Sequence, residues 1–313
     1  MPRSDSVLVI GGYGHIGRFL VPRLVDAGWV VTVLTRGNQP LPDSPAWQGL
    51  RHRHITGDYQ KLTEQHGWAR IIDDVAPSAI IDILGRDTPA IVAACPAGVR
   101  QVIVCGSVWM YGPPRQIPTP ERTQGPFPFE FYRIRYRHIQ ELLAAASGPA
   151  VTAVMPSNIA GPGKIPLDPY GSRELAIHKA MHSGLEIVLP HDGQMLVGPT
   201  DAEDIAEVFA LALDEVDKSA GRMFNAAAAY ALTYADLVTT YSRIYGVEIP
   251  VRAVDWDEFD LIVRPDPVQR YHHEAHMCAD ITAARRILGY EPKYTPEAAL
   301  QRAVEWMRSK EMI

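Results

Sequence analysis

The segment VLVIGGYGHIG, residues 7 to 17, constrains the fold more than any other stretch of the chain. An apolar run leads directly into Gly11, Gly14 and Gly17, and a helical pattern follows to about residue 27. Glycines at this spacing allow a tight turn, close approach of the backbone to a pyrophosphate, and close packing of the helix. The helix N-terminus then presents free N–H groups to the anion. The segment predicts a dinucleotide site, although a merely tight turn would use the same glycines.

Short apolar runs and helical patterns alternate through the first half of the chain. The runs are rich in Val and Ile, as strands buried on both faces of a parallel sheet are. They cover residues 6–10, 30–34, 78–83, 100–106 and 150–156, and the main helical patterns cover 15–27, 64–75 and 130–147. This alternation predicts an α/β protein with a Rossmann-type, doubly wound parallel sheet.

The rhythm of the sequence changes after about residue 157, where an irregular loop is followed mainly by helical patterns. We therefore expect residues 1–157 to form a dinucleotide-binding domain and residues 158–313 a smaller, mostly helical substrate-binding domain. The segment 196–226 contains a strongly apolar helix and is expected to pack back on the first domain.

Charge and composition favour a small-molecule substrate over a large anionic partner. The net charge of −6 leaves no basic footprint for nucleic acid or an anionic membrane. No stretch of 18 apolar residues occurs, and no long apolar segment opens the chain. Three widely separated cysteines, Cys95, Cys105 and Cys278, match neither a disulfide framework nor a zinc spacing. We expect a cytoplasmic protein with free thiols and no metal site.

The end of the second strand-like run bears on the choice of cofactor. Thr35 and Arg36 stand there, with no acid before Asp43. A carboxylate at this place binds the ribose 2′-hydroxyl of NAD, whereas an arginine accommodates the 2′-phosphate of NADP. The sequence therefore favours NADP(H), with NAD(H) as the alternative and with Arg36 as a plain surface charge also open. Asp58, in the segment GDY, is either an adenine contact or a turn residue.

Landmarks across nearly the whole chain resemble the extended and atypical short-chain dehydrogenase/reductase superfamily, in its NAD-dependent epimerase/dehydratase group. They include GGYGHIG, TRG, GDY, CGSVWMYG, MPSNIAGPG and DAEDIAEVF, and the texture is similar to the branch that contains chloroplast stem-loop RNA-binding proteins. The resemblance implies a homodimer. It also implies a set of cofactor-binding residues: Gly11, Tyr13, Gly14, His15, Ile16, Gly17, Arg36, Asp58, Tyr59, Leu84 and Pro156.

The same resemblance places the family's catalytic Ser on Ser107, its Tyr on Tyr132 and its Lys on Tyr136. In such a site the Ser holds the substrate oxygen, the Tyr exchanges a proton with it, and the Lys ammonium lowers the Tyr pKa. Because Tyr136 carries no positive charge, the pKa of Tyr132 is expected to stay near its ordinary value of about 10. The usual proton chemistry is therefore altered or absent.

Arg135 is the candidate for a replacement cation. Residues three and four apart share a helix face, so Arg135 is expected near Tyr132. Its fixed charge would stabilise a tyrosinate or an oxyanion, although it cannot exchange protons. The alternative is that Arg133, Arg135 and Arg137 form a solvated stripe or meet a dimer partner.

The substrate side also departs from the family pattern. Met155 and the segment 196–198 stand where enzymes of nucleotide sugars carry arginines, which favours a substrate without a nucleotide diphosphate, such as an apolar or aromatic metabolite. His272 and His276 lack the order and the third ligand of a metal site. The resemblance implies an oxidoreductase, epimerase or dehydratase. Two alternatives are a redox-neutral dehydratase or isomerase, and a catalytically degenerate cofactor-sensing or RNA-binding protein.

Overall fold

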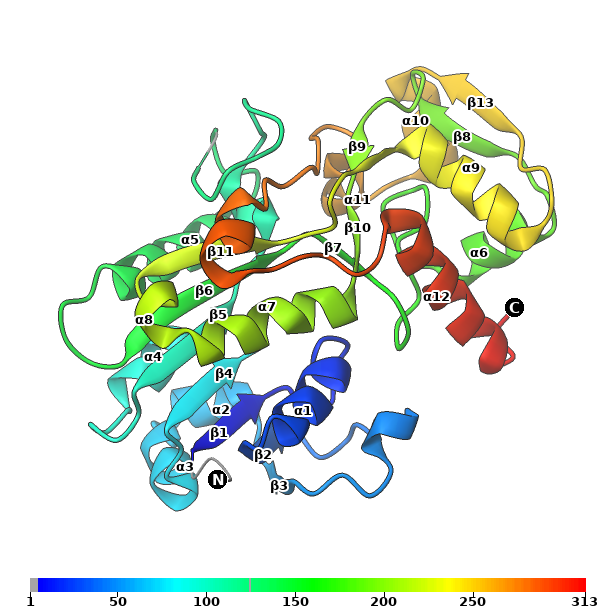
Figure 1. Ribbon diagram of the computed structural model, residues 1–313. Helices are drawn as coiled ribbons and strands as arrows, with labels where there is room; N and C mark the ends of the chain where they lie inside the picture. The colour runs from blue at the N-terminus through cyan, green and yellow to red at the C-terminus, as the bar shows by residue number, and fades with distance from the viewer. Residues whose placement is uncertain (1–4, 124) are drawn as a thin grey trace.

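The computed structural model describes residues 5–123 and 125–313, which contain a seven-stranded parallel sheet flanked by helices (Figure 1). The strand order is β11-β6-β5-β4-β1-β2-β3. The strands are β1 (Ser6–Ile10), β2 (Val30–Thr35), β3 (Arg53–Thr56), β4 (Ala79–Asp82), β5 (Gln101–Cys105), β6 (Ala150–Pro156) and β11 (Arg222–Ala226). The predicted fold class, a Rossmann-type doubly wound α/β sheet, is confirmed.

Helices cover both faces of the sheet, and the alternating side chains of its strands point into two separate cores. In β1, Val7 and Val9 belong to the core beneath α1 and α7, whereas Leu8 and Ile10 belong to the core on the opposite face. The helices of these two layers are α1 (Gly17–Asp26), α2 (Tyr59–Glu64), α3 (Trp68–Val75), α4 (Thr88–Ala93), α5 (Glu130–Leu143) and α7 (Ala202–Asp214). Burial on both faces explains why the strands are almost continuously apolar.

Segment 196–226 adds two elements to this layered structure. Helix α7 packs against α1, and after the short α8 (Val216–Ser219) strand β11 pairs in parallel with β6 at the edge of the sheet. The register places Arg222 opposite Thr152 and Ala226 opposite Pro156. The division of the chain into domains at residue 157 remains a prediction.

The rest of the chain forms a smaller body beyond the carboxyl edge of the sheet, at the upper right of Figure 1. It contains three two-stranded sheets, β10-β7, β12-β9 and β13-β8, with their own apolar core. The strands are β7 (Asn158–Ala160), β8 (Ile187–Pro190), β9 (Leu196–Val197), β10 (Pro199–Asp201), β12 (Leu232–Thr233) and β13 (Val251–Val254). The helices are α6 (Leu175–His182), α9 (Tyr234–Tyr245), α10 (Trp256–Val263), α11 (Pro267–Tyr271) and α12 (Pro296–Ser309).

Three short helical turns complete the structure. Two are 3₁₀ turns, η1 (Pro45–Trp47) and η2 (Val108–Tyr111), and the third, η3 (Ala284–Leu288), is a π-helical turn. Of the helices in the described part of the chain, none combines the length and the apolar character that a membrane crossing requires.

Candidate cofactor and active site

The glycine-rich turn between β1 and α1 is as tight as its sequence predicts. Gly11 has a φ of +82°, and a Cβ atom there would lie 3.0 Å from the side chain of Leu84. A Cβ on Gly17 would lie 2.2 Å from the Gly12 carbonyl oxygen, which no side chain tolerates. The N–H of Gly14 donates to the Gly11 carbonyl at 3.0 Å and closes the turn. The tight turn therefore leads directly into the N-terminus of α1, the end of a helix that favours an anionic group.

A cleft of about 180 Å³ opens beside this turn, at the carboxyl ends of β1, β2, β3 and β4. Six of the predicted cofactor residues line it: Gly11, Gly14, Arg36, Asp58, Tyr59 and Leu84. Arg86, which the sequence did not single out, also lines it, and its signal was a second arginine in the loop that follows a strand. In the described part of the chain neither Arg36 nor Arg86 has an ion-pair partner. The glycine cradle and the two unpaired cations suit the phosphates of a dinucleotide.

The other five predicted cofactor residues lie outside this cleft. Tyr13 contacts Trp47 edge-on and hydrogen-bonds His52 at 2.9 Å. His15 places Nε2 3.2 Å from the Gly161 carbonyl oxygen, and burial lowers its pKa to about 3, so its ring is neutral. The remaining three have structural positions: Ile16 lies in the core, Gly17 opens α1, and Pro156 ends β6.

Asp58 and Tyr59 have partners of their own at the floor of the cleft. The Asp58 carboxylate accepts the N–H of Lys61 at 3.1 Å and caps α2, the role of a turn residue. Tyr59 is buried and donates its hydroxyl to the Asp82 carboxylate at 2.8 Å.

Asp82, at the end of β4, is a fully buried carboxylate that sequence reasoning missed. It accepts hydrogen bonds from the Tyr59 hydroxyl, from the Thr88 hydroxyl at 2.8 Å and from the Gly85 N–H at 3.0 Å. Burial raises the pKa of Asp82, and these hydrogen bonds and the charge of Arg135 lower it in part. The network fixes the turn that carries Leu84 and therefore one wall of the cleft. Its signal was an acid inside an otherwise apolar strand.

The predicted catalytic Ser and Tyr belong to two elements that pack against each other, η2 and α5. Ser107 follows β5, and its hydroxyl oxygen accepts the N–H of Trp109 at 3.3 Å as the cap of η2. Tyr132 lies in the first turn of α5, which packs against η2. Burial raises the pKa of Tyr132, and the nearby charge of Arg135 lowers it in part. The phenol therefore keeps its proton at neutral pH and serves as a hydrogen-bond donor.

Tyr136 and Arg135 point in different directions from α5. Tyr136 is 8% exposed and packs against Tyr111 and Phe127. Arg135 extends to the carboxyl ends of β4 and β5, where Nη2 lies 3.3 Å from the Cys105 carbonyl oxygen and 3.5 Å from that of Leu84. Its Nε is buried without a hydrogen-bond partner in the described residues. The structure thus brings Arg135 to the side of Tyr132 and places Tyr136 in the core.

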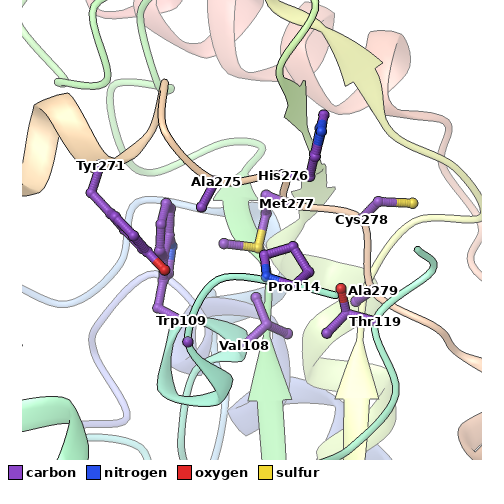
Figure 2. A pocket seen from close by; sticks show the side chains of 11 residues that line it. Val108, Trp109, Pro114, Thr119, Tyr271, Ala275, His276, Met277, Cys278 and Ala279 are labelled. Atoms are coloured by element: carbon purple, nitrogen blue, oxygen red, sulfur yellow. The ribbon is translucent and has the colours of Figure 1, made fainter. Parts of the chain in front are cut away.

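Aromatic residues from distant segments close the substrate side. Figure 2 shows Trp109 of η2 facing Tyr271 of α11, with ring centroids 4.8 Å apart. His276, Met277 and Cys278 line the same pocket from the segment after α11. Met155 lies in the core of the sheet, so neither it nor Val197, which is also buried, supplies charge to a substrate. Among residues 5–123 and 125–313, no three His, Cys, Asp or Glu side chains gather where they would hold a metal ion.

Comparison with known families identifies the family of the chain. The model of the NAD dependent epimerase/dehydratase family matches residues 7–90 and 87–227, which is more than half of the chain. The chain belongs to this family. Its members share the glycine-rich strand-to-helix turn as a dinucleotide site.

Individual relatives are distant and differ in what they do. The chain is 28% identical over 257 residues to 2′-dehydrokanamycin reductase of Streptomyces kanamyceticus, covering 78% of this chain and 67% of the relative. It is 24% identical over 306 residues to the chloroplast stem-loop binding protein of 41 kDa b of Arabidopsis thaliana. This match covers 93% of this chain and 76% of the relative. A UDP-glucose 4-epimerase of Stenotrophomonas maltophila, solved with NAD and formylated UDP-arabinopyranose, has a TM-score of 0.74 at 18% identity over 98% of this chain and 99% of its own. This last likeness shows the fold.

Proposed function

We propose that the protein is an NAD(P)-dependent oxidoreductase that interconverts a hydroxyl and a carbonyl group on a small metabolite other than a nucleotide sugar. Membership of the family supports a nicotinamide cofactor. The observation that carries the proposal is the position of Arg135, whose guanidinium reaches the carboxyl ends of β4 and β5 beside Tyr132. A cation therefore stands near the reacting phenol even though the family's lysine position holds Tyr136.

Each of the three residues has a distinct role in the proposed reaction. A bound nicotinamide cofactor supplies the hydride when a ketone is reduced and accepts it in the reverse direction. Ser107 holds the carbonyl oxygen by a hydrogen bond, and Tyr132 gives its proton to that oxygen as the carbonyl carbon gains the hydride, so an alcohol forms. Arg135 stabilises the tyrosinate that this step leaves behind, because its charge is fixed and close.

The proposal includes a preference for NADP(H) over NAD(H). Arg36 lines the cleft without an ion-pair partner in the described residues, and Arg86 adds a second positive charge. The nearest acid in the cleft, Asp58, is engaged as the cap of α2. A 2′-phosphate would therefore meet cations, whereas a ribose 2′-hydroxyl would meet no free carboxylate at the end of β2.

The surface of α5 argues against RNA binding, the alternative function that the likeness to a stem-loop binding protein raises. Arg133 pairs with Glu130, and Arg137 lies 3.7 Å from Glu141, so both positive charges are compensated on the helix itself. Arg135 turns inward. The three arginines therefore do not form the unpaired basic stripe that a phosphate backbone needs. A redox-neutral dehydratase or isomerase uses the same residues and remains the alternative.

Two further expectations belong to the proposal. The exposed face of α5, with Phe131 47% exposed, fits a homodimer built through this helix. Three free cysteines in the described structure suit a reducing compartment such as the cytoplasm.

A carbonyl screen tests the proposal directly. NADPH oxidation would be followed optically with a panel of sugar-derived and aromatic ketones, using the native protein, Ser107→Ala, Tyr132→Phe and the control Tyr230→Phe. We expect at least one ketone to be reduced, with kcat lowered about a hundredfold or more in Tyr132→Phe. Tyr230→Phe should keep the native rate, because Tyr230 is exposed and bonded to Glu297. A rate that survives Tyr132→Phe unchanged would contradict the proposed role.

A further inference from the structure

A second, larger cleft adjoins the pocket of Figure 2 on the far side of His276. We name it the acidic cleft; it has a volume of about 500 Å³. Its lining residues are Pro190, His191, Asp192, Gln194, Met195, Trp256, Arg270, His273, Glu274 and His276. The pocket between Trp109 and Tyr271 also includes His276 but encloses only about 10 Å³, the space of about one water molecule. The body of a substrate therefore fits the acidic cleft and not this pocket.

Arg270 is the cation of this cleft, and two carboxylates and an aromatic ring already contact its guanidinium. Nε donates to Glu274 at 2.8 Å, Nη1 pairs with Asp260, and the guanidinium lies 4.4 Å from the centre of the Trp256 ring. A guanidinium binds a phosphate well when its paired N–H groups are free. The charge of Arg270 is therefore compensated by two carboxylates, which makes it a poor site for a diphosphate.

Negative charge exceeds positive charge around the cleft. Asp192 has no hydrogen-bond or ion-pair partner for its carboxylate in the described part of the chain. Three carboxylates, from Asp192, Asp260 and Glu274, therefore lie around one guanidinium, that of Arg270. A partly enclosed cleft with this balance attracts cations and repels anions.

The polar groups of the cleft suit a ring that carries several hydroxyl or amino groups. His276 Nδ1 accepts the N–H of Leu196 at 3.1 Å, so in the neutral ring Nε2 bears the proton and is a donor. His273 is 1% exposed, and its Nε2 has no partner among the described residues. Gln194 adds an amide, and Asp192 adds two acceptor oxygens.

We propose that the acidic cleft binds a cationic, polyhydroxylated ring of the substrate, so that the protein acts on an amine-bearing sugar or cyclitol without a nucleotide diphosphate. This inference rests on the proposed oxidoreductase function and names its substrate class. The uncompensated carboxylate of Asp192 would pair with an ammonium group, and the histidines and Gln194 would bind hydroxyl groups.

Calorimetric titration with three probes of different charge tests this inference. The probes are kanamycin as the amine-bearing sugar, maltotriose as the neutral sugar and UDP-glucose as the anionic one. We expect kanamycin to bind tightest, and Asp192→Asn to weaken it about threefold at low salt, as loss of one exposed ion pair does. Asp217→Asn, which removes an exposed acid from α8, is the matched control and should leave the affinity unchanged. Kanamycin that does not bind, or that binds Asp192→Asn as tightly as the native protein, overturns the inference.

A second variant probes the neutralisation of Arg270. Glu274→Gln removes one of its two carboxylate partners. Compared with the native protein, we expect Glu274→Gln to bind kanamycin more weakly and UDP-glucose more tightly. Opposite changes in the two affinities overturn the inference. NADPH and NADH are titrated into the same samples, so the two proposals can be separated. If either nucleotide binds and kanamycin does not, only the substrate class fails, whereas failure of both nucleotides to bind removes the proposed function itself.

Discussion

Arg135 shows how a single side chain keeps a positive charge in a site whose expected lysine position holds tyrosine. Arg135 lies three residues and Tyr136 four residues after Tyr132, so both side chains project from α5 about one turn beyond the phenol. Only the arginine extends to the carbonyl oxygens at the ends of β4 and β5. Its charge also lowers the pKa of Asp82 against the effect of burial, so this partly exposed arginine is electrostatically linked to the buried carboxylate.

Substitution of Arg135 should separate charge from packing. We expect Arg135→Ala to lower kcat for ketone reduction about a hundredfold, because the tyrosinate formed at Tyr132 loses its nearby positive charge. Arg135→Lys, which keeps the charge, should recover most of this loss. The measurement is steady-state kinetics with the substrate that the carbonyl screen identifies.

Arg137→Ala is the matched control for this experiment. Arg137 lies on the same helix but is exposed and near Glu141, so its removal should change kcat by less than about twofold. If Arg135→Lys is as inactive as Arg135→Ala while both variants remain folded, the charge of Arg135 is not what the reaction uses.

Residue by residue, the sequence predicted which residues line the cleft at the glycine-rich turn better than it predicted the directions of the side chains on α5. Gly11, Gly14, Arg36 and Leu84 line one cleft because the motif itself dictates the turn and the strand ends. The direction of Arg135 and the burial of Tyr136 depend on how α5 packs, which a helical pattern alone does not specify. Asp82 was missed because an isolated acid in a strand has no spacing partner to reveal it.

At the scale of elements, the strands were predicted closely and the helices less so. The predicted runs at 6–10 and 150–156 match β1 and β6, since buried strands show themselves by continuous Val and Ile. The helix predicted at 64–75 starts only at Trp68, because His66 has a φ of 52° and Gly67 caps the new helix. Helix α4, with six residues, is too short for a period to be seen.

The start of α7 contains a carboxylate whose ionisation opposes folding. Asp201 is fully buried, caps α7 by accepting the N–H of Glu203 at 2.9 Å, and lies 3.4 Å from Arg302 Nη1. Burial raises the pKa of Asp201 to about 7. Because the folded pKa exceeds the unfolded one, its contribution to stability is complete below pH of about 4 and is lost as pH rises through about 7.

Replacement of Asp201 by Asn should therefore stabilise the protein at alkaline pH only. Asn keeps an acceptor for the helix cap and never ionises. At each pH, the Tm of the native protein is subtracted from the Tm of Asp201→Asn. We expect this difference to be roughly 3 °C larger at pH 8 than at pH 5. Differential scanning calorimetry at the two pH values measures this difference. Asp255→Asn, at the exposed cap of α10, should show no such difference, and a larger gain at pH 5 than at pH 8 for Asp201→Asn would refute the argument.

At the scale of the whole molecule, the cleft at the glycine-rich turn is lined by residues that all lie within 10–86, whereas the pocket between Trp109 and Tyr271 is lined by segments far apart in the sequence. The rings of Trp109 and Tyr271 are in contact, and the Leu196 N–H donates to His276. Both pairs are far apart in the sequence, so no local sequence pattern predicts them. The sequence indicated that the family's substrate arginines were missing, but it did not reveal that Arg270 is held by Asp260 and Glu274. The Trp109–Tyr271 contact joins the smaller body to η2 at the end of β5, whereas the contacts of Arg270 and His276 form within the smaller body.

The central claim is that this chain is a nicotinamide-dependent enzyme, and calorimetric titration with NADPH and NADH tests it most directly. Native protein, Arg36→Ala and the control Arg53→Ala would be compared, since Arg53 is exposed and paired with Asp74. We expect NADPH to bind at least about tenfold more tightly than NADH, and Arg36→Ala to abolish most of that preference while Arg53→Ala preserves it. Failure of both nucleotides to bind nucleotide-free native protein would contradict the claim.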